Sequence, residues 1–309
     1  MDVRLANPRG FCAGVDRAIE VVEKALEVHG APVYVLHEIV HNRYVVEDLA
    51  SRGVVFVDDL DEVPAGSVTI FSAHGVSDEV VRSAERRDLR VIDATCPLVT
   101  KVHLQAQSYH LKGNHVILIG HPGHPEVEGT RGRIDGTVTV LSTVEEVDAL
   151  EVADPTRLAY VTQTTLSIDD TREVIDALVR RFPAIKGPNL RDICYATQNR
   201  QNAVRRLAEE GIDVLIVIGS KNSSNSNRLA ELGARKGVAS HLIDDASEIR
   251  PEWLAPHARV GVTAGASAPE SLVREVVQRL KELGAGSVEE MPGEVEAVEF
   301  QLPESLSST

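Results

Sequence analysis

The sequence predicts an α/β protein made of three small parallel-sheet domains that pack around a pseudo-threefold axis. The same order of apolar runs and helical patterns occurs three times along the 309 residues. Each repeat contains one cysteine, at Cys12, Cys96 and Cys194. Strands that alternate with helices favour parallel sheets joined by right-handed crossovers. We therefore expect three domains with the same internal order.

Each repeat opens with a short apolar run that leads to its cysteine, and a helical pattern begins directly afterwards. We expect these runs to be strands, at residues 3–6, 90–95 and 189–193. Each such strand can complete the sheet of the preceding domain, so we place the boundaries at the cysteines. The resulting domains are 1–96, 97–193 and 194–285, followed by a tail at 286–309.

Three further strands are expected in each repeat, because apolar runs are followed there by polar loops or turn residues. The first strands and their loops lie within 33–42, 115–126 and 214–227, and each loop opens a helix. Short second strands lie within 54–59, 138–143 and 240–246. The last strands and the loops that open a third helix lie within 68–79, 158–170 and 259–270.

The polar loops lie at similar distances from the cysteines, with 29 positions to His41, 28 to His124 and 29 to Ser223. Ligands of parallel sheets bind at the carboxyl ends of the strands, where these loops lie. Three domains around one axis can therefore bring nine loops together, with the cysteines at the centre.

Three converging thiols indicate a shared ligand, and two chemistries stay open. Zinc can take three thiolates and one histidine, whereas an iron–sulfur cluster on three thiolates would leave one iron without a protein sulfur. The gaps between the cysteines are 84 and 98 residues, with no close pair, which favours a central cofactor over a local zinc site. The remaining alternative is three unrelated buried thiols.

Charge and composition exclude several classes of protein. The net charge of −15 disfavours partners such as nucleic acid or anionic membranes. We find no apolar run of roughly 20 residues and no signal peptide, and the few cysteines form no disulfide framework, so a cytoplasmic location is expected. Neither dinucleotide nor P-loop motifs are found, so electrons for any redox step must come from an external donor.

The loops are rich in groups that bind a small anion. Histidines can donate to phosphate oxygens, and short polar side chains near helix starts add further donors. The candidates are His41, His74, His124, Ser223, Ser224, Asn225 and Ser267. A helix cap is the alternative for each serine or asparagine, and Ser267 before Ala-Pro-Glu is a good example.

Glu126 follows a stiff, histidine-rich loop and has mostly apolar neighbours. Burial there would raise the pKa of its carboxyl and make it a proton source. Stabilisation of the first helical turn is the alternative role.

Nine stretches in order resemble the signatures of the hydroxymethylbutenyl diphosphate reductases, the IspH or LytB family. They are RGFCAGVDRAI, EIVHNRYVVEDL, FSAHGVS, DATCPLVTKVH, GHPGHPEVEGT, VTQTTLS, ICYATQNRQ, GSKNSSNSNRL and TAGASAPE. The resemblance covers the chain from about Arg9 to the helix after Pro269, and only the tail is a loose match.

The resemblance implies a fold, a cofactor and a site. The fold is a cloverleaf of three α/β domains around a [4Fe–4S] cluster, which is ligated by Cys12, Cys96 and Cys194 and has one iron not bound by cysteine. The catalytic residues it implies are Glu126 as proton source, Thr164 near the substrate hydroxyl, and His124. Six of the polar residues named above would bind the diphosphate, with Ser224 nearby, and Thr164 would complete the substrate-binding set at the hydroxyl. The six are His41, His74, His124, Ser223, Asn225 and Ser267.

The implied reaction is the reductive dehydroxylation of 4-hydroxy-3-methylbut-2-enyl diphosphate to isopentenyl and dimethylallyl diphosphate, the last step of the methylerythritol phosphate route. A ferredoxin or flavodoxin type of protein would donate the electrons. The alternatives are a zinc or metal-free binding protein for a phosphorylated metabolite and a non-redox cluster dehydratase.

Overall fold

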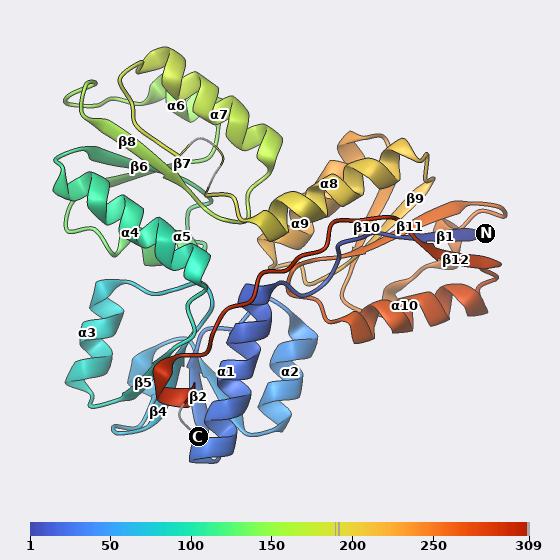
Figure 1. The fold of residues 1–309 in the computed structure, drawn as a ribbon, viewed down its shortest axis with the longest axis horizontal. Helices are drawn as coiled ribbons and strands as arrows, with labels where there is room; N and C mark the ends of the chain where they lie inside the picture. Colours follow the sequence, from blue (N-terminus) through green and yellow to red (C-terminus); the bar gives the residue numbers. More distant parts are fainter. Residues whose placement is uncertain (189, 191, 308–309) are drawn as a thin grey trace. The chain divides into compact units, whose positions relative to one another are not determined.

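The computed structural model describes residues 1–188, 190 and 192–307 and divides into two compact units (Figure 1). Unit 1 consists of Met1–Asp16, Val40–Leu49 and Tyr195–Glu299. Unit 2 consists of Arg17–Ile39, Ala50–Cys194 and Phe300–Thr309. The division falls inside two helices, α1 (Ala13–His29) and α2 (Arg43–Ser51).

Unit 1 contains one parallel sheet of five strands in the order β10-β9-β11-β1-β12. The strands are β1 (Asp2–Leu5), β9 (Val214–Ile218), β10 (Ala239–Ile243), β11 (Arg259–Ala264) and β12 (Ser287–Glu290). Helices α8 (Tyr195–Glu209) and α9 (Ser224–Arg235) cover one face, and α10 (Glu270–Glu282) covers the other (Figure 1). Short 3₁₀ helices lie at η2 (Ala246–Glu248) and η3 (Pro251–Trp253).

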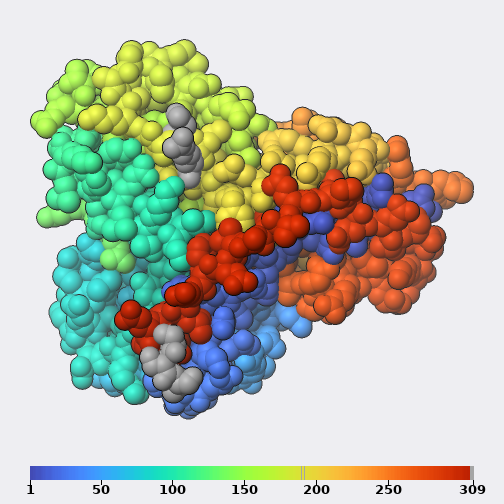
Figure 2. All heavy atoms as spheres, viewed as in Figure 1, coloured from blue at the N-terminus to red at the C-terminus, as the bar shows by residue number. Residues whose placement is uncertain are grey.

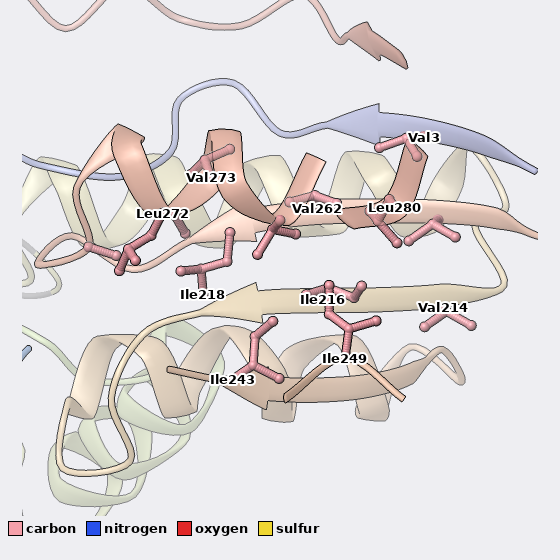
Figure 3. Close-up of a cluster of buried hydrophobic side chains, with 14 of the residues drawn as sticks. Val3, Val214, Ile216, Ile218, Ile243, Ile249, Val262, Leu272, Val273 and Leu280 are labelled. Carbon is pink, nitrogen blue, oxygen red and sulfur yellow. The ribbon is translucent and has the colours of Figure 1, made fainter. Parts of the chain in front are cut away.

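The central strand β9 is apolar at every position because both of its faces are covered. Ile216 and Ile218 face α10, where they pack with Leu272 and Leu280 (Figure 3). Leu215 lies in the separate core beneath α8 and α9. The carboxyl ends of β9 and β11 are therefore held at one edge of a rigid sheet.

Unit 2 contains two parallel sheets, in the orders β3-β2-β4-β5 and β7-β6-β8. The first consists of β2 (Val33–Leu36), β3 (Val54–Val57), β4 (Val68–Phe71) and β5 (Arg90–Asp93), and the second of β6 (His115–Ile119), β7 (Val138–Leu141) and β8 (Leu158–Thr162). The helices are α3 (Asp78–Arg86), α4 (Pro97–Leu111), α5 (Pro125–Arg131), α6 (Val144–Ala149), α7 (Ile168–Arg181), α11 (Glu304–Ser307) and the 3₁₀ helix η1 (Leu60–Glu62).

The same order of strands occurs in all three sheets. The second strand of each repeat lies at the edge, the first strand lies next to it, and the third strand lies on the other side of the first. All pairings between these strands are parallel. The predicted fold class of three parallel-sheet α/β domains is therefore confirmed. The strand before Cys12, β1, pairs with β11, and the strand before Cys96, β5, pairs with β4.

Two expectations differ from the structure. Of the strand expected at 189–193, positions 189 and 191 lie outside the described residues, and Leu190, Asp192 and Ile193 lie in a turn and a bend. The edge of that sheet is used instead by Lys186, which forms an isolated bridge to Ala159. The chain from position 286 was expected to be a tail after the third domain, and its first residues form β12 on the sheet of unit 1.

The exact domain boundaries stay a prediction. Among the helices of the described residues, none combines the length and the apolar character that crossing a membrane requires.

Candidate functional site

Each cysteine lies beside the loop that follows the last strand of a repeat. The backbone N–H of each cysteine donates to a carbonyl oxygen of such a loop, Cys12 to Ala266 (3.3 Å), Cys96 to Ala73 (3.0 Å) and Cys194 to Thr164 (3.1 Å). None of these three cysteines forms a disulfide, and all three residues are partly exposed. A helix begins directly after each of them, so each thiol lies where a parallel sheet offers its ligand-binding edge.

In unit 1 the loops after β9 and β11 are linked to His41. Ser267 Oγ donates to the carbonyl oxygen of His41 (2.8 Å). Asn222 Nδ2 lies 3.5 Å from His41 Nδ1. Ser220 Oγ accepts from Arg43 N at 2.9 Å, which ties the segment after His41 to the loop after β9.

Asn225 is a buried amide without a partner. The residue is 4% exposed. Within the described residues, neither its Oδ1 nor its Nδ2 has a hydrogen-bond partner. Nearly all buried polar groups in proteins are hydrogen-bonded. Asn225 therefore has a donor and an acceptor available to a ligand at the start of α9.

The alternative role as a helix cap applies to one serine and not to another. Ser223 is the N-cap of α9, since its side chain accepts from the backbone N–H of Ser226. Ser267 does not cap α10, because Pro269 occupies the N-cap position. The hydroxyl of Ser267 is instead part of the contact with His41.

In unit 2, Glu126 and Thr164 form a closed pair inside the protein. Thr164 N donates to Glu126 Oε1 at 2.7 Å, and Thr164 Oγ1 donates to Glu126 Oε2 at 2.9 Å. Glu126 is 2% exposed and Thr164 is 5% exposed. Burial raises the pKa of Glu126 to about 7, which the hydrogen bonds from Thr164 oppose and the charge of Asp192 increases.

His124 adjoins this pair through the backbone. It caps α5, and its Nδ1 accepts from the N–H of Glu126 at 3.1 Å. A neutral His124 in this arrangement carries its proton on Nε2 and can donate it to a ligand.

His74 belongs to the same cluster. The rings of His74 and His124 meet edge to face, with 5.9 Å between their centroids. Gly129 makes this contact possible, since a Cβ there would lie 3.0 Å from the carbonyl oxygen of Gly75. A larger residue would push α5 away from the loop that contains His74.

Asp192 is a buried carboxylate near Glu126 that was not among the residues predicted from the sequence. This residue is 3% exposed, and its Oδ1 lies 3.5 Å from Lys101 Nζ. Its charge acts on the pKa of Glu126. The feature of the sequence that could have revealed it is a carboxylate two positions before Cys194, within a stretch that was expected to be a strand.

The predicted site residues are divided between the two units. Unit 1 contains Cys12, His41, Ser223, Ser224, Asn225 and Ser267, and unit 2 contains His74, Cys96, His124, Glu126, Thr164 and Cys194. Among the described residues of either unit, no three His, Cys, Asp or Glu side chains lie close enough together to bind a metal ion. Burial raises the pKa of the Cys12 thiol, and the positive charge of Arg200 opposes this.

The fold and these groups define a class: a parallel α/β protein whose strand-end loops present thiols, imidazoles, hydroxyls and a buried carboxyl. The family model described as LytB protein matches residues 3–281. The chain belongs to this family, which confirms the resemblance in the sequence.

The relatives match this chain over nearly their full lengths. A 4-hydroxy-3-methylbut-2-enyl diphosphate reductase of Bordetella pertussis is 61% identical over 306 residues, which are 99% of this chain and 94% of that protein. The protein named 4-hydroxy-3-methylbut-2-enyl diphosphate reductase 2 of Bradyrhizobium diazoefficiens is 58% identical over 309 residues, all of both chains.

Two solved structures are also similar. The E-1-hydroxy-2-methyl-but-2-enyl-4-diphosphate reductase of Plasmodium falciparum matches with a TM-score of 0.95 and 36% identity, over 99% of this chain and 96% of that one. A second reductase, titled the terminal enzyme of the non-mevalonate pathway, matches with a TM-score of 0.65 and 36% identity, over 91% of this chain and 100% of that one.

Proposed function

We propose that this chain is a 4-hydroxy-3-methylbut-2-enyl diphosphate reductase, which removes the substrate hydroxyl reductively and forms isopentenyl and dimethylallyl diphosphate. The observation that supports this best is the buried pair of Glu126 and Thr164. The pKa of the Glu126 carboxyl is about 7, and the backbone carbonyl of its partner Thr164 accepts a hydrogen bond from the N–H of Cys194. Reductive loss of a hydroxyl as water requires a proton source, and this pair lies beside a cysteine that we propose as a cluster ligand.

The cofactor proposed is a [4Fe–4S] cluster held by Cys12, Cys96 and Cys194, with one iron not bound by cysteine. The donor set suits it, since each of the three cysteines lies directly before a helix without forming a disulfide, and thiolates are the usual ligands of such clusters. When bound, the cluster supplies electrons one at a time and a Lewis-acidic iron. The electrons would come from an external protein of ferredoxin or flavodoxin type.

The diphosphate is proposed to bind at the polar loops. In unit 1, Asn225 contributes an unpaired amide at the start of α9, where backbone N–H groups favour negative charge. Ser223, Ser224, Ser267 and His41 add donors around it. His74 and His124 provide imidazole donors in unit 2.

Glu126 is proposed to hold the proton that leaves with the hydroxyl as water. In the protonated carboxyl, Oε2 donates to Thr164 Oγ1 across the 2.9 Å that separates them. The hydroxyl of Thr164 can then donate its own proton toward the substrate oxygen, so that the pair moves one proton outward. The C–O bond breaks, two electrons enter from the external donor, and a second proton adds to carbon, which balances the reaction.

The experiment is anaerobic turnover of 4-hydroxy-3-methylbut-2-enyl diphosphate by the full chain, with and without an added one-electron reductant. We expect both five-carbon diphosphate products, and only when the reductant is present. Dehydration without reductant would indicate a cluster dehydratase, and binding without turnover would indicate a binding protein. Either result would contradict the proposal.

A further inference from the structure

The C-terminal strap, defined as Met291–Glu299, lies along the segment that leads to Cys12. It continues from β12, and Met291 N donates to the carbonyl oxygen of Leu5 at 3.0 Å. Met291 is buried, at 2% exposed. Gly293 packs so closely on Asn7 that a Cβ would overlap the Asn7 backbone. Figure 2 shows the C-terminal residues in red beside the blue N-terminal ones.

Charged contacts hold the beginning of this segment. Arg9 Nη1 donates to Glu290 Oε2 at 2.6 Å, and Arg9 Nη2 donates to Glu270 Oε1 at 2.7 Å. Asn7 Nδ2 also donates to Glu290, at 3.1 Å. The segment is therefore fixed both to the end of β12, directly before the strap, and to the first turn of α10.

Arg200 holds the end of the segment from inside the protein. Its side chain is 0% exposed, although the sequence of α8 does not predict that an arginine is buried at this position. Its Nη2 donates to the carbonyl oxygens of Gly10 (2.7 Å) and Phe11 (2.9 Å), and its Nε also donates to Gly10 (2.9 Å). These are the two residues directly before Cys12.

Glu296 of the strap provides the counter-charge. Its two carboxylate oxygens accept from the Arg200 guanidinium at 3.0 to 3.2 Å, and Oε1 also accepts from Asn199 Nδ2 at 3.0 Å. The side chain of Glu296 is 13% exposed. Removing one partner of a buried ion pair leaves an uncompensated charge, which costs far more than the pair contributes.

We propose that Glu296 and Arg200 are positioning residues for the Cys12 thiol, with the strap fixing the guanidinium and the guanidinium fixing the two carbonyls before Cys12. The strap is then a part of the site and not a loose tail. The inference rests on the proposed function only in treating Cys12 as a cluster ligand. The alignment of the thiol itself is a property of the chain without metal.

The test compares alkylation rates of the three thiols in the full-length metal-free chain, read by mass spectrometry of the cysteine peptides. In Glu296→Ala we expect the Cys12 rate to rise about tenfold or more, because the released guanidinium no longer holds the loop closed. Cys96 and Cys194 are internal controls and should keep their rates. Glu294→Ala is the matched control, since Glu294 is exposed on the same strap.

Glu296→Gln keeps the shape and part of the hydrogen bonding, so we expect a smaller rise, again at Cys12 alone. This variant decides the question if Glu296→Ala does not fold. An unchanged Cys12 rate in a folded variant, or an equal rise at all three cysteines, would overturn the proposal.

Iron release from the loaded chain to a chelator is the second readout, and it should be faster in Glu296→Ala and largely restored in Glu296→Gln. Equal release rates in the wild type and Glu296→Ala would contradict the positioning role. If the chain binds no iron at all, the proposed function fails, and the alkylation rates still decide the role of the strap.

Discussion

At the scale of single residues, the proposed reaction depends on the carboxyl of Glu126, which is buried away from water. Glu126 is buried, and both of its oxygens are bonded to Thr164. An exposed glutamate would be ionised at neutral pH and would have no proton to give. Burial therefore raises the pKa of this carboxyl to about 7, which suits the proposed role as an acid near neutral pH.

Replacing Glu126 by Gln should leave substrate binding nearly unchanged and lower kcat at least about a hundredfold, the usual scale of acid–base assistance. The amide oxygen can still accept from Thr164 N, so the fold of the site is kept. Steady-state kinetics and a binding titration measure the two effects. Glu128→Gln, two positions along the same helix and exposed, is the control, and near-normal turnover in Glu126→Gln would remove Glu126 from this role.

The pH dependence of kcat follows from the same group. The raised pKa keeps Glu126 protonated below about 7 and ionised above it. The proton source is thus present at lower pH and lost as the pH rises through about 7, and kcat should then fall by about tenfold per pH unit. A pH–rate profile of the wild type checks this, and a flat profile up to about pH 9 would be inconsistent with it.

At the scale of elements, the strand ends and the helix starts position the groups that we propose as ligands. The loop after β9 leads into α9, whose second residue is the unpaired Asn225. Gly129 lets α5 approach the loop of His74. Packing of helices on sheets within each unit, rather than any single motif, therefore determines where each of these side chains lies.

Asn225→Ala should weaken substrate binding by about tenfold to a hundredfold, since a hydrogen bond to a charged group contributes about 1.5–3 kcal/mol. The melting temperature should stay the same, because no internal bond of the described chain is lost. Binding titration and thermal unfolding measure the two effects. Glu231→Ala on α9 is the control, and a large loss of stability without loss of affinity would mean a purely structural role.

The sequence allowed the elements to be predicted where periodicity was strong. Continuous apolar runs such as Val214–Ile218 predicted buried parallel strands, and the threefold order predicted three sheets. The strand β12 was missed because Ser287–Glu290 has only one apolar side chain, and pairing with β1 decides its structure. Arg200 and Asp192 were missed because burial of a charge depends on partners that are far away in sequence.

At the scale of the whole molecule, the thiols come from both compact units, two in one and one in the other. If one cofactor uses all three, each cysteine should matter equally. Cys12→Ser, Cys96→Ser and Cys194→Ser should each lower the iron content and abolish turnover, as determined by metal analysis of each purified variant. An intact and active cluster in all three variants would refute the ligand assignment.

The most direct test of the account is the amount of iron and acid-labile sulfide per chain in protein purified without oxygen. We expect about four of each in a brown protein, or about three of each if the iron without a thiolate is lost. Zinc in their place, or no metal after anaerobic reconstitution, would contradict the three-cysteine cluster and with it the reductase mechanism.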